Sequence, residues 1–147
     1  MAIIRLNPGP LHQTAGYAHV TIVDSGRLAV LAGQCPLDRD EQLVGPGDVL
    51  AQADQVAANA AEALAAAGAA PADVIRSVIY VVSDDQGVLS AVWDRLTASA
   101  IGPAFTTAST LLGVAALGYR GQLVEVDLTA ALPDQPAQPA AGGGQGT

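Results

Sequence analysis

Lysine is missing from this chain of 147 residues, and cysteine, tryptophan and phenylalanine occur only once each. The six cations are arginines, and together with 14 carboxylates they give a net charge of −8. The arginines are spread from Arg5 to Arg120 without a cluster. Such a chain lacks the electrostatic footprint of proteins that bind nucleic acid or anionic membranes. We therefore expect no nucleic-acid partner and no membrane partner.

The low cysteine count and the absence of long apolar runs exclude further classes. Cys35 stands alone, so the chain has no intrachain disulfide and no CxxC metal or redox pair. No apolar run approaches the ~20 residues that span a bilayer. Met1–Gln13 carries prolines and polar residues where a secretory signal would have a basic start and an apolar core. These observations predict a cytoplasmic protein, and Cys35 is expected to be a small buried thiol or a loop thiol.

What the chain does contain predicts one domain. Half of its residues are apolar and only 3% are aromatic, so alanine, valine, leucine and isoleucine must build the core. We place this domain at residues 1–132. Residues 133–147 contain proline, alanine, glycine and glutamine without a large apolar side chain, and are expected to form a disordered tail.

Periodicity and turn residues predict the elements of the domain. After an irregular arm, Met1–Gly16, two alternating strands form a hairpin, and two helices and three more strands follow. The strands are expected at Tyr17–Val23, Arg27–Gln34, Val74–Ser83, Thr106–Leu117 and Gln122–Leu132, and the helices at Val49–Ala67 and Gln86–Ala100. Asp48 and Gly68 are the expected caps of the first helix, and Asp84-Asp85 begin the second.

The resulting order, β-β-α-β-α-β-β, is that of an α+β two-layer domain with one sheet and two helices on one of its faces. The other face would then carry apolar residues that nothing in the monomer covers. This asymmetry predicts oligomerisation through the open face.

One carboxylate stands out in the last strand. Glu125 lies between Val124 and Val126, so its side chain points to the opposite side of the sheet from both. Two interpretations remain open from the residues alone. Either that face is solvent and Glu125 is a solvated strand residue, or Glu125 lines a pocket.

Several spaced motifs resemble one known family. Gly33-Gln34-Cys35-Pro36-Leu37-Asp38 is similar to the SGQxPLD segment of the RidA family, also called YjgF/YER057c/UK114. Further matches are Gln52 and Asn59, Ala65–Ala69, Asp73-Val74-Ile75, Ala108-Ser109-Thr110 and Leu123–Asp127. They occur in the family's order over roughly residues 15 to 131, which is far more specific than any single motif.

The resemblance implies a chorismate-mutase-like fold and a homotrimer with a central sheet barrel. It also implies small-molecule clefts at the subunit interfaces and the hydrolysis of reactive enamines or imines, without a metal or an organic cofactor. Carried over residue by residue, it makes Glu125 the residue that orients or activates the attacking water. Tyr17, Gly33, Gln34 and Ser90 become candidate substrate-binding residues, with Trp93 as the aromatic neighbour of Ser90.

This sequence differs from the family at the substrate-binding arginine, because the arginine's position is occupied here by Ser109. A neutral hydroxyl cannot replace the bidentate pairing of a guanidinium with a carboxylate. Arg120, in the turn before Glu125, is a second candidate for contacting the substrate. The sequence thus predicts a RidA-like enamine or imine hydrolase of a subgroup without the arginine, acting on a small metabolite other than 2-aminoacrylate. The alternatives are a non-catalytic small-molecule-binding or regulatory trimer and, less favoured, an endoribonuclease or translation inhibitor.

Overall fold

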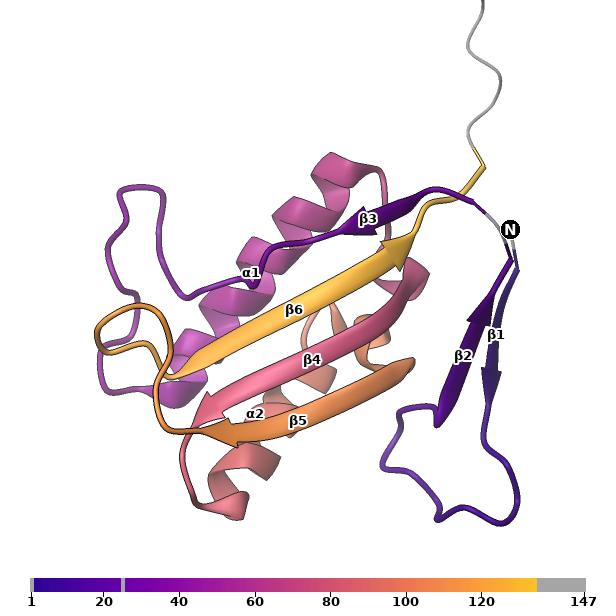
Figure 1. Cartoon of the computed structure of the whole chain (residues 1–147). Coiled ribbons are helices and arrows are strands. Elements are labelled where there is room, and N and C mark those ends of the chain that lie inside the picture. The colour runs from indigo at the N-terminus through magenta and orange to yellow at the C-terminus, as the bar shows by residue number, and fades with distance from the viewer. Residues whose placement is uncertain (1, 25, 135–147) are drawn as a thin grey trace, which may run out of the picture.

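A four-stranded sheet with two helices packed on one face forms the centre of the molecule (Figure 1). The computed structural model describes residues 2–24 and 26–134. The strand order is β3-β6-β4-β5, with β6 antiparallel to β3 and β4, and β5 parallel to β4. The strands are β3 (Leu28–Val30), β4 (Val74–Val82), β5 (Ala108–Val114) and β6 (Val124–Ala131), and the helices are α1 (Val49–Ala67) and α2 (Gln86–Thr97). Short 3-10 helices lie at Pro71–Asp73 and Gly102–Phe105. The predicted α+β fold is confirmed.

Helix α1 has the predicted bounds because both of its ends are capped. The Asp48 carboxylate accepts the Ala51 amide at 3.0 Å, and Gly68 adopts the left-handed conformation with φ of 81°. Small side chains let the helix lie close on the sheet, and Ala53, Val56 and Ala60 are fully buried. Helix α2 begins after the Asp85 cap, as predicted, but ends at Thr97, three residues earlier than expected. Residues 98–100 form a turn in which the Ser99 hydroxyl donates to the Leu96 carbonyl.

The N-terminal segment differs from the prediction. The arm is not wholly irregular, because β1 (Ile3–Leu6) pairs antiparallel with β2 (Val20–Val23) in a second, two-stranded sheet. The predicted hairpin between the strands at Tyr17–Val23 and Arg27–Gln34 is therefore wrong. β3 pairs with β6 instead, and the ladder continues where the Leu31 amide donates to the Leu128 carbonyl at 3.0 Å. Local turn residues suggested a neighbour in sequence, whereas the partner that formed is about a hundred residues away.

The face of the main sheet opposite the helices is uncovered, as predicted. On it Val30 is 76% exposed and Leu28 is 53% exposed, and Leu112 lies on the same face at 41%. The β1–β2 ribbon also presents an apolar face, because the exposed pairs Ile4–Ile22 and Leu6–Val20 lie side by side in its register. Isolated exposed leucines are ordinary, but here two strand faces of one small domain expose apolar side chains side by side.

The predicted tail, residues 133–147, lies almost entirely outside the described residues, which end at 134. Within the described part of the chain, neither helix is long and apolar enough to cross a membrane.

Candidate functional site

Glu125 lies on the open face of the main sheet. Its neighbours Val124 and Val126 are fully buried under the helices, and the pleat directs Glu125 to the other side. Two side chains donate hydrogen bonds to the same carboxylate oxygen, Oε1: the Gln122 amide and the Cys35 thiol, both at 3.1 Å. Glu125 is therefore a half-buried carboxylate in a fixed orientation rather than a freely solvated strand residue.

The other carboxylate oxygen, Oε2, lies against the backbone of Gly33. A Cβ atom at position 33 would sit 2.5 Å from Oε2, so only glycine leaves room for this carboxylate. The adjacent Gln34 is part of the sheet: its amide donates to the Val126 carbonyl at 2.7 Å, and its side chain returns to the Ala32 carbonyl. Gln34 thus holds the Gly33 backbone beside Glu125. We call Gly33, Cys35, Gln122 and Glu125 the carboxylate site.

The Cys35 thiol is perturbed by this environment. Burial, the hydrogen bond to Glu125 and the charge of Glu125 together raise the pKa of Cys35 from 9.0 to about 11. A thiol of this kind remains protonated at neutral pH, where it is a hydrogen-bond donor and a poor nucleophile.

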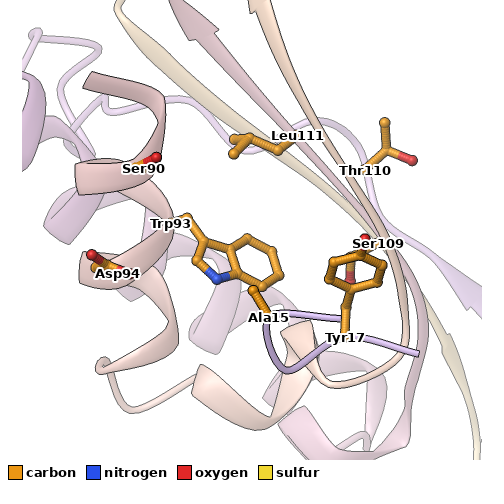
Figure 2. Close-up of a pocket in the computed structure, with 8 residues that line it drawn as sticks. All are labelled: Ala15, Tyr17, Ser90, Trp93, Asp94, Ser109, Thr110 and Leu111. Atoms are coloured by element: carbon orange, nitrogen blue, oxygen red, sulfur yellow. The ribbon is translucent and has the colours of Figure 1, made fainter. Parts of the chain in front are cut away.

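A second group of predicted residues lies in a pocket between β5, α2 and the chain before β2 (Figure 2). Its volume is about 530 Å³, within the range of small-molecule sites. We call it the aromatic pocket, and its lining residues are Ala15, Tyr17, Ser90, Trp93, Asp94, Ser109, Thr110 and Leu111. The structure thus brings the predicted residues Tyr17, Ser90 and Ser109 together with Trp93.

Ring packing gives the aromatic pocket its shape. The Tyr17 and Trp93 rings meet edge to face, with centroids 6.1 Å apart, and Trp93 makes a second such contact with buried Phe105. The Tyr17 hydroxyl is paired with the His12 imidazole at 2.9 Å. Asp94 is the only charged residue among those that line the pocket, and it is exposed on α2.

The Ser109 hydroxyl is bound within the fold. It pairs with the hydroxyl of buried Ser77 on the neighbouring strand and can also donate to the Thr107 carbonyl at 3.0 Å. No histidine contacts it within the described chain, so no base activates it as a nucleophile.

The carboxylate site and the aromatic pocket belong to opposite faces of the main sheet. Ser109 pairs in register with Ser77, which is fully buried on the helix side, whereas Glu125 is in register with Tyr80 on the open face. A single chain therefore does not bring Ser109 and Glu125 to one small ligand. Arg120 joins neither group: it is exposed in the turn at 120–121, and within the described chain it is not among the residues that line the aromatic pocket or contact Glu125.

Sequence reasoning missed the donors that hold Glu125. The sequence predicts only a small buried or loop thiol for Cys35, and Gln122 lies three residues before Glu125 at the edge of the strand. The available signal was a glutamine in an apolar run, because a buried amide needs polar partners. Gln122 is only 2% exposed.

Two amides of α1 hold the segments that carry these donors. Buried Gln52 donates to the Gly121 carbonyl at 3.0 Å and accepts the Leu123 amide at 2.7 Å, so it brackets Gln122. Asn59 donates to the carbonyls of Cys35 and Leu37 at 2.8 and 2.9 Å. Two polar residues of the alanine-rich helix α1 thus fix the two backbone segments that carry Gln122 and Cys35.

The described residues contain no group of three or more histidine, cysteine, aspartate or glutamate side chains that could hold a metal ion. The chemistry available at the site is that of one oriented carboxylate, one thiol donor, one amide and a pocket lined by rings and hydroxyls.

Comparison with known proteins identifies the family and supports the fold. The family model described as Endoribonuclease L-PSP matches residues 10–132. The chain belongs to the Rid family. A Rid-family protein of unknown function from Yersinia pestis, YyfB, is 34% identical, with a TM-score of 0.79 over 90% of this chain and 100% of that one. A member of the YjgF/YER057c/UK114 family from Mycobacterium tuberculosis is 27% identical, with a TM-score of 0.54 over 89% of this chain and 100% of that one.

A further relative is Protein DfrA of Myxococcus xanthus, which is 36% identical over 115 residues, spanning 78% of this chain and 83% of that protein. Family membership and fold therefore rest on sequence and on architecture together.

Proposed function

We propose that this Rid protein hydrolyses small imines or enamines, in the cytoplasm, at a site shared between neighbouring copies of a homotrimer. The single observation that carries the proposal is the orientation of Glu125, whose Oε1 is held by two donors while Oε2 lies against the Gly33 backbone. A fixed carboxylate can accept a proton from a water molecule that attacks an electrophilic carbon.

The reaction is balanced as follows. An enamine first becomes an imine by moving a proton to carbon. The oxygen of water then bonds to the imine carbon as one of its protons passes to Glu125, and the C=N electron pair moves to the nitrogen, which takes that proton back from Glu125. The hydroxyl of the resulting carbinolamine then gives its own proton to the nitrogen by way of Glu125, so that the C=O bond forms as the carbon–nitrogen bond breaks. The products are a carbonyl compound and ammonia, and no oxidant, metal or organic cofactor is consumed.

The composition of the aromatic pocket supports a substrate without a carboxylate. Its lining holds the rings of Tyr17 and Trp93, the Ser109 hydroxyl and the Asp94 carboxylate, and no cation. An anionic substrate would lack a partner there and would meet the charge of Glu125 as well. A neutral or cationic imine fits this set of groups better, since aromatic faces attract cations and Asp94 is an anion.

The positions of the aromatic pocket and the carboxylate site support a site that is shared between copies. Ser109 and Glu125 lie on opposite faces of one chain, so a ligand that uses both needs a second copy. The exposed apolar faces of the main sheet and of the β1–β2 ribbon supply a surface for that copy. This geometry agrees with the trimer that the family resemblance implies.

The test is an ammonia-release assay with a panel of uncharged, cationic and carboxylate-bearing imines, including 2-aminoacrylate generated in place by a dehydratase. We expect wild type to accelerate uncharged or cationic imines and to leave 2-aminoacrylate almost unchanged. Ser109→Arg should move the preference toward the carboxylate-bearing substrates. Glu62→Gln, which alters an exposed glutamate on α1, is the matched control for Glu125→Gln. Turnover that is equal in wild type and Glu125→Gln, or absent for every imine, would overturn the proposal.

The second candidate is a binding or regulatory trimer without turnover. It is favoured by the Ser109 hydroxyl, which is already bound to Ser77 and to backbone carbonyls and offers no reactive group to a ligand. Tight binding of a small amine, measured by thermal shift without product formation, would support this candidate over the hydrolase. The net charge of −8 gives an endoribonuclease activity no support.

A further inference from the structure

The two oxygens of the Glu125 carboxylate have different surroundings. Oε1 accepts from both the Gln122 amide and the Cys35 thiol, each at 3.1 Å. Among the residues that the structure describes, no hydrogen bond reaches Oε2, which faces the Cα of Gly33. Two donors on one oxygen and none on the other make the carboxylate asymmetric.

The Gln122 donor cannot turn away. Its side chain is buried, and its amide NH₂ also donates to the Val124 carbonyl at 3.1 Å. At the other end of the same amide, the Gln122 oxygen accepts the Tyr119 backbone N–H at 3.2 Å. Since a flipped amide would place its NH₂ against the Tyr119 N–H, the network fixes the NH₂ on Glu125.

The Cys35 donor is held from the backbone. Asn59 on α1 binds the Cys35 carbonyl at 2.8 Å, and the Asn59 oxygen is in turn bound by Gln55 at 2.9 Å. The thiol therefore approaches Oε1 from a loop whose position the helix sets. Because the pKa of Cys35 is about 11, the thiol keeps its proton through the neutral range and continues to donate.

We propose that Cys35 and Gln122 are positioning residues that clamp Oε1 of Glu125 and leave Oε2 as the oxygen that receives the proton of the attacking water. The catalytic half of this inference rests on the proposed function. The clamp itself is a property of the structure and can be tested without any substrate.

The first test follows the thiol. Cys35 is the only cysteine, so protein labelled with ¹³C at cysteine Cβ gives one signal, whose pH titration reports the Cys35 thiol. Glu125→Gln removes the charge next to the thiol, and we expect the titration midpoint to fall by roughly one pH unit, about a tenfold change in thiolate at a given pH. Glu62→Gln should leave it unchanged. A midpoint that does not move in Glu125→Gln overturns the clamp.

The second test separates positioning from structure. Cys35→Ala should lower kcat by about tenfold with KM changed little, since a carboxylate free to rotate aims its water poorly. Cys35→Ser restores an O–H donor and should recover most of the loss. Gln122→Met, which keeps the length of the side chain without its donor, should act like Cys35→Ala and lower kcat with KM changed little.

The outcomes are distinguishable. Equal kcat in Cys35→Ala, Cys35→Ser and wild type overturns the positioning role, as does a loss in Cys35→Ala that appears only as lowered stability. If wild type turns over no imine, the proposed function fails, and the titration of Cys35 alone then decides whether the clamp exists.

Discussion

The aromatic pocket and the carboxylate site are built in different ways. The pocket is shaped by ring contacts among Tyr17, Trp93 and Phe105, which are weak individually and tolerate small shifts. The carboxylate site depends on directed hydrogen bonds from Cys35 and Gln122. Binding a range of small compounds asks only for a suitable shape, whereas aiming one water molecule requires fixed atoms. If the proposed function holds, the difference teaches that substrate specificity and reactivity are assigned to separate parts of this fold.

The largest expected effect comes from mixing two inactive variants. Ser90→Trp fills the aromatic pocket, and Glu125→Gln removes the carboxylate, so each protein alone should lose about a hundredfold or more of its activity. If a site combines the pocket of one copy with the carboxylate of its neighbour, random mixed trimers regain about one quarter of the wild-type activity. The measurement is ammonia release after the two variants are unfolded and refolded together.

Refolding each variant separately and then combining them is the control for this mixing experiment. A mixture with no more activity than either variant would show that pocket and carboxylate do not act together across copies.

A smaller loss is expected when the carboxylate is moved rather than removed. The Cβ of Gly33→Ala would lie 2.5 Å from Oε2, so Glu125 must rotate away from its donors. We expect kcat to fall by about tenfold to a hundredfold while the fold persists. Gly118→Ala, where a Cβ meets no atom within 4 Å, is the matched control. Unchanged activity in Gly33→Ala would mean that the position of Oε2 is unimportant.

The stability of the protein should depend on alkaline pH through Cys35. The folded protein holds the thiol proton up to about pH 11, whereas an unfolded chain releases it near 9.0. The neutral thiol therefore favours the folded state fully below pH 9, and this contribution is lost as the pH rises from 9 to 11. Urea unfolding across that range should show a steeper fall in stability for wild type than for Cys35→Ala. Since the chain has no lysine, few other groups titrate there.

Parallel pH curves for wild type and Cys35→Ala would show that the thiol is no more perturbed than in an unfolded chain. That result would also argue against the contact between the Cys35 thiol and the Glu125 carboxylate, on which the carboxylate site depends.

The smallest effect is expected from Tyr17→Phe in the aromatic pocket. Tyr17→Phe keeps the ring that contacts Trp93 and loses only the hydroxyl that pairs with exposed His12. We expect KM to change by about twofold and kcat not at all, because exposed hydrogen bonds contribute little. Steady-state kinetics would check this, and a tenfold fall in kcat would place the Tyr17 hydroxyl in the reaction itself.

The sequence was sufficient for elements whose determinants are local. Asp48, Gly68 and the spacing of buried alanines predict the bounds of α1, and the alternation around Glu125 predicts its face. The pairing of β2 and β3 was not predictable in this way. Both strands are short, and their partners β1 and β6 are set by tertiary contacts that no turn residue announces.

The candidate site was predictable only in part, for the same reason. The family motifs identified Tyr17, Ser90, Ser109, Gly33 and Glu125, and the structure places them in two separate groups. Which oxygen of Glu125 is free depends on contacts that span long stretches of chain: Cys35 to Glu125 spans 90 residues. Composition and periodicity carry no information on such contacts.

The hydrogen bonds of Gln52 offer a way to follow the order in which parts of the domain come together during folding. Its side chain joins the Gly45 carbonyl, the Gly121 carbonyl and the Leu123 amide, so the loop before α1 and the segment before β6 meet at one buried residue. During folding, the Leu123 amide gains its acceptor only once α1 has docked on the sheet. Hydrogen exchange of that single amide would therefore report when α1 and the segment that leads into Glu125 have come together.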